Sequence, residues 1–186
     1  MRFVEWLLPN EEVRSVLREK ADTLLRVLTQ KTSTPELANA FFTGDIDFAQ
    51  ETINHFLQRT ISVRDYDEAF YHGTLTELLN LDGKRFTLHS NYETGEGYAD
   101  IIAEDEARKL CFVIEVKRGD PSRITSKKEN RLEQRRKIFC EALDRGEAQI
   151  KDRYYVEGVL QNEDYRCRGY VIAFYGKECR IRCVDV

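Results

Sequence analysis

The sequence predicts an α/β protein whose central mixed β-sheet is flanked by helices, with a helical region at the N-terminus. Two observations favour this class. Apolar side chains recur at helical spacing through the first third of the chain, and strand-like runs then follow in two groups. A long helical pattern separates the two groups, and a crossover of this length usually returns the chain parallel to the strand that it left. The last strand before the crossover should therefore lie near the centre of the sheet.

The N-terminal helical region is expected to span residues 1–60 and to pack on a core of residues 61–186. Asn10 follows a proline and is a favourable N-cap for a first helix. Thr34 caps a second helix that begins with a proline, and this helix should end before Gly44. A third helix is indicated by the spacing of its apolar side chains, which are Phe48, Ile53, Phe56 and Leu57.

A fourth helix, within residues 62–80, places an acid among its apolar side chains. Glu68 lies on the same helical face as Tyr71, Leu75 and Leu79. An acid on a core-facing stripe costs stability unless it has a partner or a metal ion. Alternatively, Glu68 lies in the first turn, where the helix dipole favours it and water still reaches it. Helix spacing alone favours this second interpretation.

Alternating residues and apolar runs predict the strands. Residues 85–89 alternate as a first strand, and two more strands flank a charged turn at 104–109. The helical crossover should cover residues 132–154 and break at Gly146. Two final strands, joined by a Gly-Lys hairpin turn at 176–177, span residues 169–174 and 179–184.

Charged side chains stand beside the most apolar strand of the sequence. Residues 110–114 form the continuous apolar run that is typical of a strand buried on both faces. Glu115 and Lys117 follow and share one face, because side chains alternate along a strand, while Asp100 lies on the preceding strand. Two carboxylates can bind Mg²⁺, and a lysine beside them can orient a water molecule or take its proton. Spacing alone favours an ordinary buried ion pair over such a site.

Composition indicates a soluble globular protein, with 41% hydrophobic and 33% charged residues. No apolar stretch approaches the roughly 20 residues that a membrane span needs. The N-terminus lacks a signal-peptide pattern, so we expect a cytoplasmic protein without a membrane partner. The five cysteines include no CxxC pair, and we expect small buried thiols in a reducing compartment rather than a metal site or disulfides.

The net charge of −4 does not favour bulk attraction to nucleic acid. Between residues 117 and 137, however, nine Lys or Arg residues face three acids. Such a run is often only a solvated helix face. Because it begins at the charged end of the central strand, it is also a candidate phosphate-binding surface. The candidate nucleic-acid contacts are Arg118, Arg123, Lys127, Lys128, Arg131 and Arg135.

The sequence around the two middle strands resembles that of the PD-(D/E)XK nuclease superfamily. The similar residues are Ser90, Asn91, Glu93, Gly95, Gly97 and Asp100, followed by Ile114, Glu115, Val116 and Lys117. The chain looks closest to the branch found C-terminal to AAA-type ATPase domains in bacteria and archaea. Glu68 and residues 70–73 resemble the first helix of that branch, and the segment around Gln149 resembles its downstream helix. Ala99 stands where the family name has proline, and the sequence contains no phosphate-loop motif.

The resemblance implies a restriction-endonuclease-like core and a set of active-site roles. Asp100 and Glu115 would be ligands of Mg²⁺ or Mn²⁺, and Lys117 would be the catalytic lysine. Glu68 would be a further acid at the metal, often through water. Gln149 would be an active-site residue near the metal or the substrate.

The leading hypothesis is a metal-dependent nuclease that hydrolyses phosphodiester bonds in DNA. Expected partners are nucleic acid, an AAA-type ATPase domain or protein, and a second copy of the chain, since nucleases that cut both strands often pair. Two alternatives stay open: a catalytically silent module that binds nucleic acid or a partner ATPase, and a purely structural ion network.

Overall fold

The computed structural model describes residues 37–60, 67–80, 86–94, 97–123, 130–152 and 165–186. The first predicted helix and its cap at Asn10 lie outside these residues, as do Thr34, Gly95, Lys127 and Lys128. No helix of the described ranges is long and apolar enough to cross a membrane.

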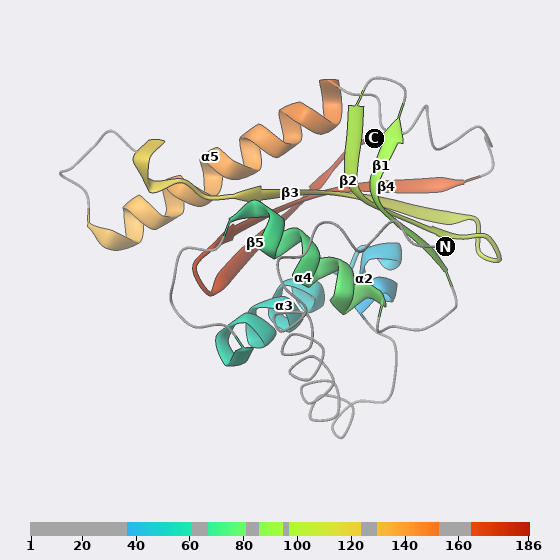
Figure 1. Ribbon diagram of the computed structural model, residues 1–186, viewed down its shortest axis with the longest axis horizontal. Coiled ribbons are helices and arrows are strands. Elements are labelled where there is room, and N and C mark those ends of the chain that lie inside the picture. Colours follow the sequence, from blue (N-terminus) through green and yellow to red (C-terminus); the bar gives the residue numbers. More distant parts are fainter. Residues whose placement is uncertain (1–36, 61–66, 81–85, 95–96, 124–129, 153–164) are drawn as a thin grey trace.

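A five-stranded mixed sheet forms the centre of the molecule (Figure 1), and its strands follow one another in sequence order. Strands β3 and β4 are parallel, and every other neighbouring pair is antiparallel. The predicted α/β class, the mixed sheet and the parallel return are therefore confirmed. The strands are β1 (Thr87–Thr94), β2 (Gly97–Asp105), β3 (Leu110–Arg118), β4 (Arg166–Tyr175) and β5 (Glu178–Val184).

Helices cover both faces of this sheet (Figure 1), because β3 is apolar on both sides. Ile114 and Val116 pack in the cluster with the three earlier helices, whereas Val113 packs under the crossover helix. A short 3₁₀ helix, η1 (Pro121–Arg123), follows β3. The α-helices are α2 (Leu37–Thr43), α3 (Ile46–Thr60) and α4 (Glu68–Asn80) on one face and α5 (Arg131–Asp152) on the other.

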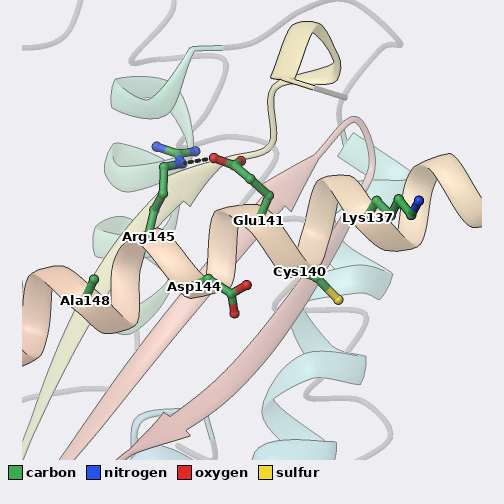
Figure 2. A pocket seen from close by; sticks show the side chains of 6 residues that line it. All are labelled: Lys137, Cys140, Glu141, Asp144, Arg145 and Ala148. Atoms are coloured by element: carbon green, nitrogen blue, oxygen red, sulfur yellow. Dashed lines mark ion pairs between the residues drawn. The ribbon is translucent and has the colours of Figure 1, made fainter. Parts of the chain in front are cut away.

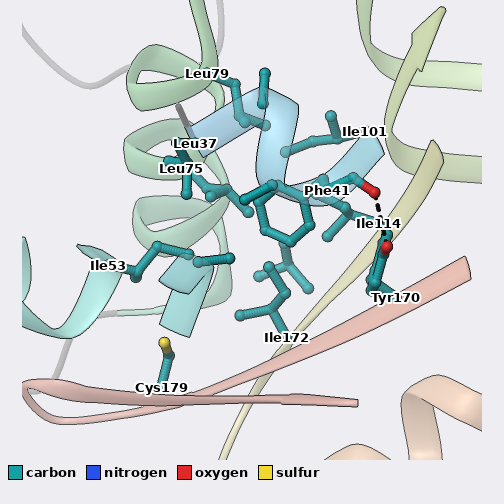
Figure 3. Packing of buried hydrophobic residues seen from close by; sticks show 14 of the residues in the cluster. Leu37, Phe41, Ile53, Leu75, Leu79, Ile101, Ile114, Tyr170, Ile172 and Cys179 are labelled. Carbon is teal, nitrogen blue, oxygen red and sulfur yellow. Dashed lines mark hydrogen bonds between the residues drawn. The ribbon is translucent and has the colours of Figure 1, made fainter. Parts of the chain in front are cut away.

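The larger core cluster joins α2, α3 and α4 to the sheet (Figure 3). Tyr170 is fully buried on β4, and its hydroxyl donates a hydrogen bond of 2.7 Å to the carbonyl oxygen of Phe41. Tyr71 of α4 stacks on Phe174 with ring centroids 4.6 Å apart, and its hydroxyl donates to the carbonyl oxygen of Gly176. Burying one such side chain contributes about 1.5–3 kcal/mol. The contacts of Tyr71 fix the start of α4 against the end of β4, where Phe174 is paired with Arg118 at the end of β3.

Helix α4 begins at Glu68, within the predicted range of 62–80. Asp67 caps it, because its Oδ1 accepts a hydrogen bond of 2.8 Å from the backbone N–H of Phe70. The acid at position 68 therefore lies in the first turn, where the helix dipole stabilises a negative charge.

The predicted break in the crossover helix is wrong, because α5 continues through Gly146. This glycine permits a close approach of the helix to the sheet. A Cβ atom at position 146 would lie 2.3 Å from Cγ1 of Val171 and 3.2 Å from Cγ of Lys117. Close packing against β3 and β4 thus explains a glycine that local propensity interprets as a helix breaker.

The expectation that the cysteines form no disulfide is also wrong. Cys111 and Cys167 are directly opposite in the parallel register of β3 and β4, and a disulfide joins them. Their Cα atoms lie 4.5 Å apart, a separation that a disulfide can span. The sequence could not reveal this pairing, because the register across a crossover is not encoded in cysteine spacing. Cys179 is a free buried thiol, as predicted, whereas Cys140 and Cys183 are free and exposed.

Candidate active site

Strands β2 and β3 separate at the point where the predicted acids occur. Their last paired residues are Ile101 and Ile114, although β3 continues beside β4 as far as Arg118. Beyond that pair, the backbone of β3 has no paired strand on its β2 side within the described residues. The N–H of Val116 instead donates a hydrogen bond of 2.7 Å to Oδ2 of Asp100. A carboxylate thus lies in the opening between the two strands.

Glu68 occupies the next position along the same edge of β3. Its Oε2 accepts a hydrogen bond of 2.9 Å from the backbone N–H of Arg118. The side chain is 45% exposed, so it lies in the first helical turn, still reached by water, and also points at the predicted site. Glu68 is therefore both a solvated acid in the first turn of α4 and an acid directed at the predicted site.

Lys117 and Glu115 form a buried ion pair on the α5 side of β3. Glu115 is fully buried and Lys117 is 6% exposed. The ammonium group of Lys117 donates a hydrogen bond to Oε1 of Glu115 and another, of 3.0 Å, to the carbonyl oxygen of Val116. It also lies 3.6 Å from Oε1 of Glu68. One lysine therefore links two of the three predicted acids.

Helix α5 closes this site through its glycine and one arginine. Gly146 lies against the Lys117 side chain, and Arg145 donates a hydrogen bond of 2.7 Å from Nη2 to the carbonyl oxygen of Arg118. Arg145 also pairs with Glu141 one turn earlier, with Nε and Oε1 2.9 Å apart (Figure 2). Arg145 was not among the residues predicted for the site.

Gln149 lies one turn after Gly146 and is half-buried. The helical spacing places both residues on the same side of α5, which is the side that packs near Lys117. Its predicted role in the active site stays a prediction.

His72, which was not among the residues predicted for the site, also contacts it. Nε2 of His72 lies 2.9 Å from the carbonyl oxygen of Asp100 and 3.1 Å from Oγ of Ser90. His72 follows Glu68 by four residues on α4, and this spacing places both on one face of the helix. This four-residue spacing from Glu68 is the feature of the sequence that could have identified His72 as a site residue.

Burial dominates the electrostatics of Asp100. Desolvation raises the pKa of this carboxyl above its ordinary value of 3.8. The hydrogen bond from Val116 and the charges of Lys117 and His72 act in the opposite direction, whereas the charge of Glu68 adds to the increase in pKa. A carboxylate that is costly to ionise gains from an additional cation at the same place.

The side chains of the site fit a hard divalent cation in their chemistry. Glu68, Asp100 and Glu115 supply carboxylate oxygens, the ligands that Mg²⁺ and Mn²⁺ prefer. Oδ1 of Asp100 has no hydrogen-bond partner within the described ranges, since the bond from Val116 goes to Oδ2. In the arrangement observed, however, no three or more His, Cys, Asp or Glu residues of the described part form a group that could hold a metal ion. The ammonium of Lys117 lies beside Glu115 and Glu68 instead.

The predicted nucleic-acid contacts that the structure describes belong to three elements, β3, η1 and α5. Arg118 lies at the site, and Arg131 is exposed at the first residue of α5. Arg135 pairs with Glu178 of β5, with Nη2 and Oε2 2.7 Å apart. It lines a hollow of about 580 Å³ between α5 and β5, together with Arg136 and Arg180. Arg123 belongs to η1.

Comparison with known families places this geometry in context. Searches of curated proteins and of solved structures gave no significant match to the chain. A family model described as the PD-(D/E)XK nuclease superfamily matches residues 66–183. The matched range begins just before Glu68, includes Gln149 and covers the five strands except for the last residue of β5. The chain therefore belongs to the PD-(D/E)XK nuclease superfamily.

Proposed function

We propose that this protein is a metal-dependent nuclease that hydrolyses phosphodiester bonds in DNA. The supporting observation is the cluster of Asp100, Glu115 and Lys117 at the opening between β2 and β3. A chain without a catalytic role has no physical need to place a buried carboxylate and a buried lysine beside a second acid whose pKa is raised. Membership of a nuclease superfamily supports the same reaction class.

In this proposal the three acids hold Mg²⁺ or Mn²⁺. Asp100 and Glu115 would be direct ligands, and the more exposed Glu68 would contact the ion through water. The ion, when bound, supplies a Lewis acid at the phosphate and lowers the pKa of a bound water molecule. Gln149 contacts the ion's water shell or the substrate.

Lys117 then has a second set of partners. In the reaction, the ammonium group of Lys117 would donate to the attacking water or to the phosphate oxygen on which negative charge develops. Its position is fixed from the backbone side, because it also donates to the carbonyl oxygen of Val116. Arg118 and Arg131 would contact the phosphates that flank the cleaved bond, as would Arg123, Lys127, Lys128 and Arg135 from their segment.

Finer features rest on the sequence alone. We propose that the chain belongs to the branch associated with AAA-type ATPases, that such an ATPase is a partner, and that the protein is cytoplasmic. We also propose that residues 1–60 form a helical region on a nuclease core of 61–186, and that two copies pair to cut both strands.

The direct test is cleavage of plasmid and linear DNA with Mg²⁺ or Mn²⁺, with and without EDTA. The wild-type protein should cut, EDTA should abolish cutting, and Lys117→Ala should lose at least a hundredfold in rate because the lysine acts on charge that develops during the reaction. Lys151→Ala is the matched control, since Lys151 is an exposed lysine of α5 whose ion-pair partner among the described residues is Glu147. Equal cutting by Lys117→Ala and wild type would contradict the proposal.

One observation favours a second candidate function, a catalytically silent nuclease-fold module that binds nucleic acid or a partner ATPase. The Lys117 ammonium lies where a cation would neutralise Glu115 and Glu68. Calorimetric titration with Mn²⁺ separates the two candidates. Heat of binding that disappears in Asp100→Ala supports the nuclease, whereas absence of heat in both proteins supports the module.

A further inference from the structure

The β1–β2 ladder is interrupted at Asp100. Ser90 pairs with Ile101 and Tyr92 pairs with Ala99, but Asn91 and Asp100 between them do not pair. Asn91 has φ of 53°, in the left-handed region, which turns its backbone groups away from those of an extended strand. Asp100 has therefore lost its partner on β1, and it also lies beyond the last pair of β2 with β3.

The carbonyl oxygen of Asp100 is bound by a side chain instead of by a strand. Nε2 of His72 lies 2.9 Å away. A carbonyl oxygen can only accept, so Nε2 must carry a proton and donate it. The same proton faces Oγ of Ser90 at 3.1 Å, which accepts in turn. The contacts thus fix the tautomer of His72 and the direction of its ring.

His72 also connects the two elements that carry the acids. Glu68 begins α4 and binds the N–H of Arg118, while His72 on the next turn binds the backbone of Asp100 on β2. The carboxylate of Asp100 then reaches the N–H of Val116. Without the bond from His72, Asp100 would have neither a strand partner nor a side-chain anchor for its carbonyl oxygen among the contacts described.

We propose that His72, supported by Ser90, is the positioning residue of this site: it replaces the missing strand pairing of Asp100 and so aims the carboxylate of Asp100 into the opening between β2 and β3. The role in catalysis rests on the proposed nuclease function. The role in positioning does not, because it concerns contacts that exist without metal or substrate.

Two amide substitutions separate this role from general packing. The side-chain nitrogen of His72→Gln can reach the position of Nε2 and donate to the carbonyl oxygen of Asp100. His72→Asn carries the same group but is one methylene shorter, so its nitrogen falls near the position of Nδ1 instead. Both variants remove the ring, so a difference between them reports the hydrogen bond. His55→Asn, on α3 outside the site, is the control for loss of a histidine.

The first readout is the NMR signal of the Val116 amide proton in metal-free protein. A hydrogen bond to a carboxylate moves this signal downfield, and Asp100→Ala defines its position without the bond. We expect His72→Asn to move the signal toward that of Asp100→Ala, and His72→Gln and His55→Asn to leave it near the wild-type position. A wild-type signal in folded His72→Asn would overturn the proposal.

The second readout is the Mn²⁺ dissociation constant by calorimetry. We expect a tenfold to hundredfold loss of affinity in His72→Asn, as is usual for residues that orient a ligand, with recovery in His72→Gln. If His72→Gln fails as His72→Asn does while both are folded, the hydrogen bond is not the cause and the proposal falls. If wild type binds no Mn²⁺, the nuclease proposal fails alone, and the Val116 signal still decides the role of His72.

Discussion

The Lys117 ammonium and the Glu115 carboxylate form an ion pair that is buried at the centre of the sheet, with Glu115 fully inaccessible to solvent. Such a pair contributes little net stability while intact, but removal of one partner leaves an uncompensated charge in the core. The predictions below begin from this pair and then follow the packing around it.

Substitution of Lys117 by Met should destabilise the metal-free protein by about 3–5 kcal/mol, because Glu115 is left without its cation. The double variant Lys117→Met with Glu115→Gln should recover much of this loss, since no charge then remains buried. Urea unfolding in EDTA measures both. Lys151→Met should cost only about 0.3–0.5 kcal/mol, the value of an exposed helical pair. If Lys117→Met destabilised the protein by no more than Lys151→Met does, Glu115 would not be ionised in the folded protein.

Gly146→Ala should destabilise the protein by about 1–3 kcal/mol, although alanine is the better helix former. The added methyl group would overlap Val171 and press on the stem of Lys117. Thermal unfolding measures this loss. Ala148→Gly is the control: position 148 is on the exposed side of α5, so this change alters helix propensity without the packing effect, in the direction opposite to Gly146→Ala. Combining Gly146→Ala with Val171→Ala should cost less than the sum of the single changes, because the second change vacates the space. Strict additivity would contradict the contact.

The raised pKa of Asp100 predicts a pH dependence with a definite sign. In the folded protein this carboxyl keeps its proton at higher pH than in the unfolded chain, whose value is near 3.8. The folded state then binds more protons, so the free energy of unfolding should fall as pH rises from that value through the folded pKa. Asp100→Asn should remove this part of the decline. Thermal unfolding from pH 4 to 8 in EDTA tests it, and identical slopes for the two proteins would contradict it.

Reduction of the disulfide between Cys111 and Cys167 should lower stability by about 2–4 kcal/mol, because the bond closes a long loop in the unfolded chain. The comparison is urea unfolding with and without a phosphine reductant. Cys140→Ser provides the control, since this thiol is free and exposed, and its substitution should leave the effect of reductant unchanged. No effect of reductant on wild type would mean that the disulfide does not form in solution.

The local sequence predicted the elements around the site well. The apolar run of β3, the helix within residues 62–80 and the Gly-Lys turn of the last hairpin each follow from residues close together in the chain. Glu115 and Lys117 share a face because strand side chains alternate, and no tertiary information is needed for that.

The features that sequence reasoning missed depend on contacts between distant segments. Gly146 is interpreted as a break unless the nearness of Val171 is known. The pairing of Cys111 with Cys167 needs the register of two strands joined by a crossover. His72 gains its role only because the ladder fails at Asp100, and a single left-handed residue, Asn91, accompanies that failure.

Val116 and Arg118 donate their hydrogen bonds to Asp100 and Glu68 from backbone N–H groups. Their donors therefore do not depend on which side chains stand at these positions. Most substitutions at 116 and 118 would change packing or charge and leave both anchors intact, whereas proline alone removes the donor. Most mutations in this part of β3 should therefore leave the alignment of Asp100 and Glu68 unchanged. Substrate contacts at position 118 can be redesigned without loss of the hydrogen bond that anchors Glu68.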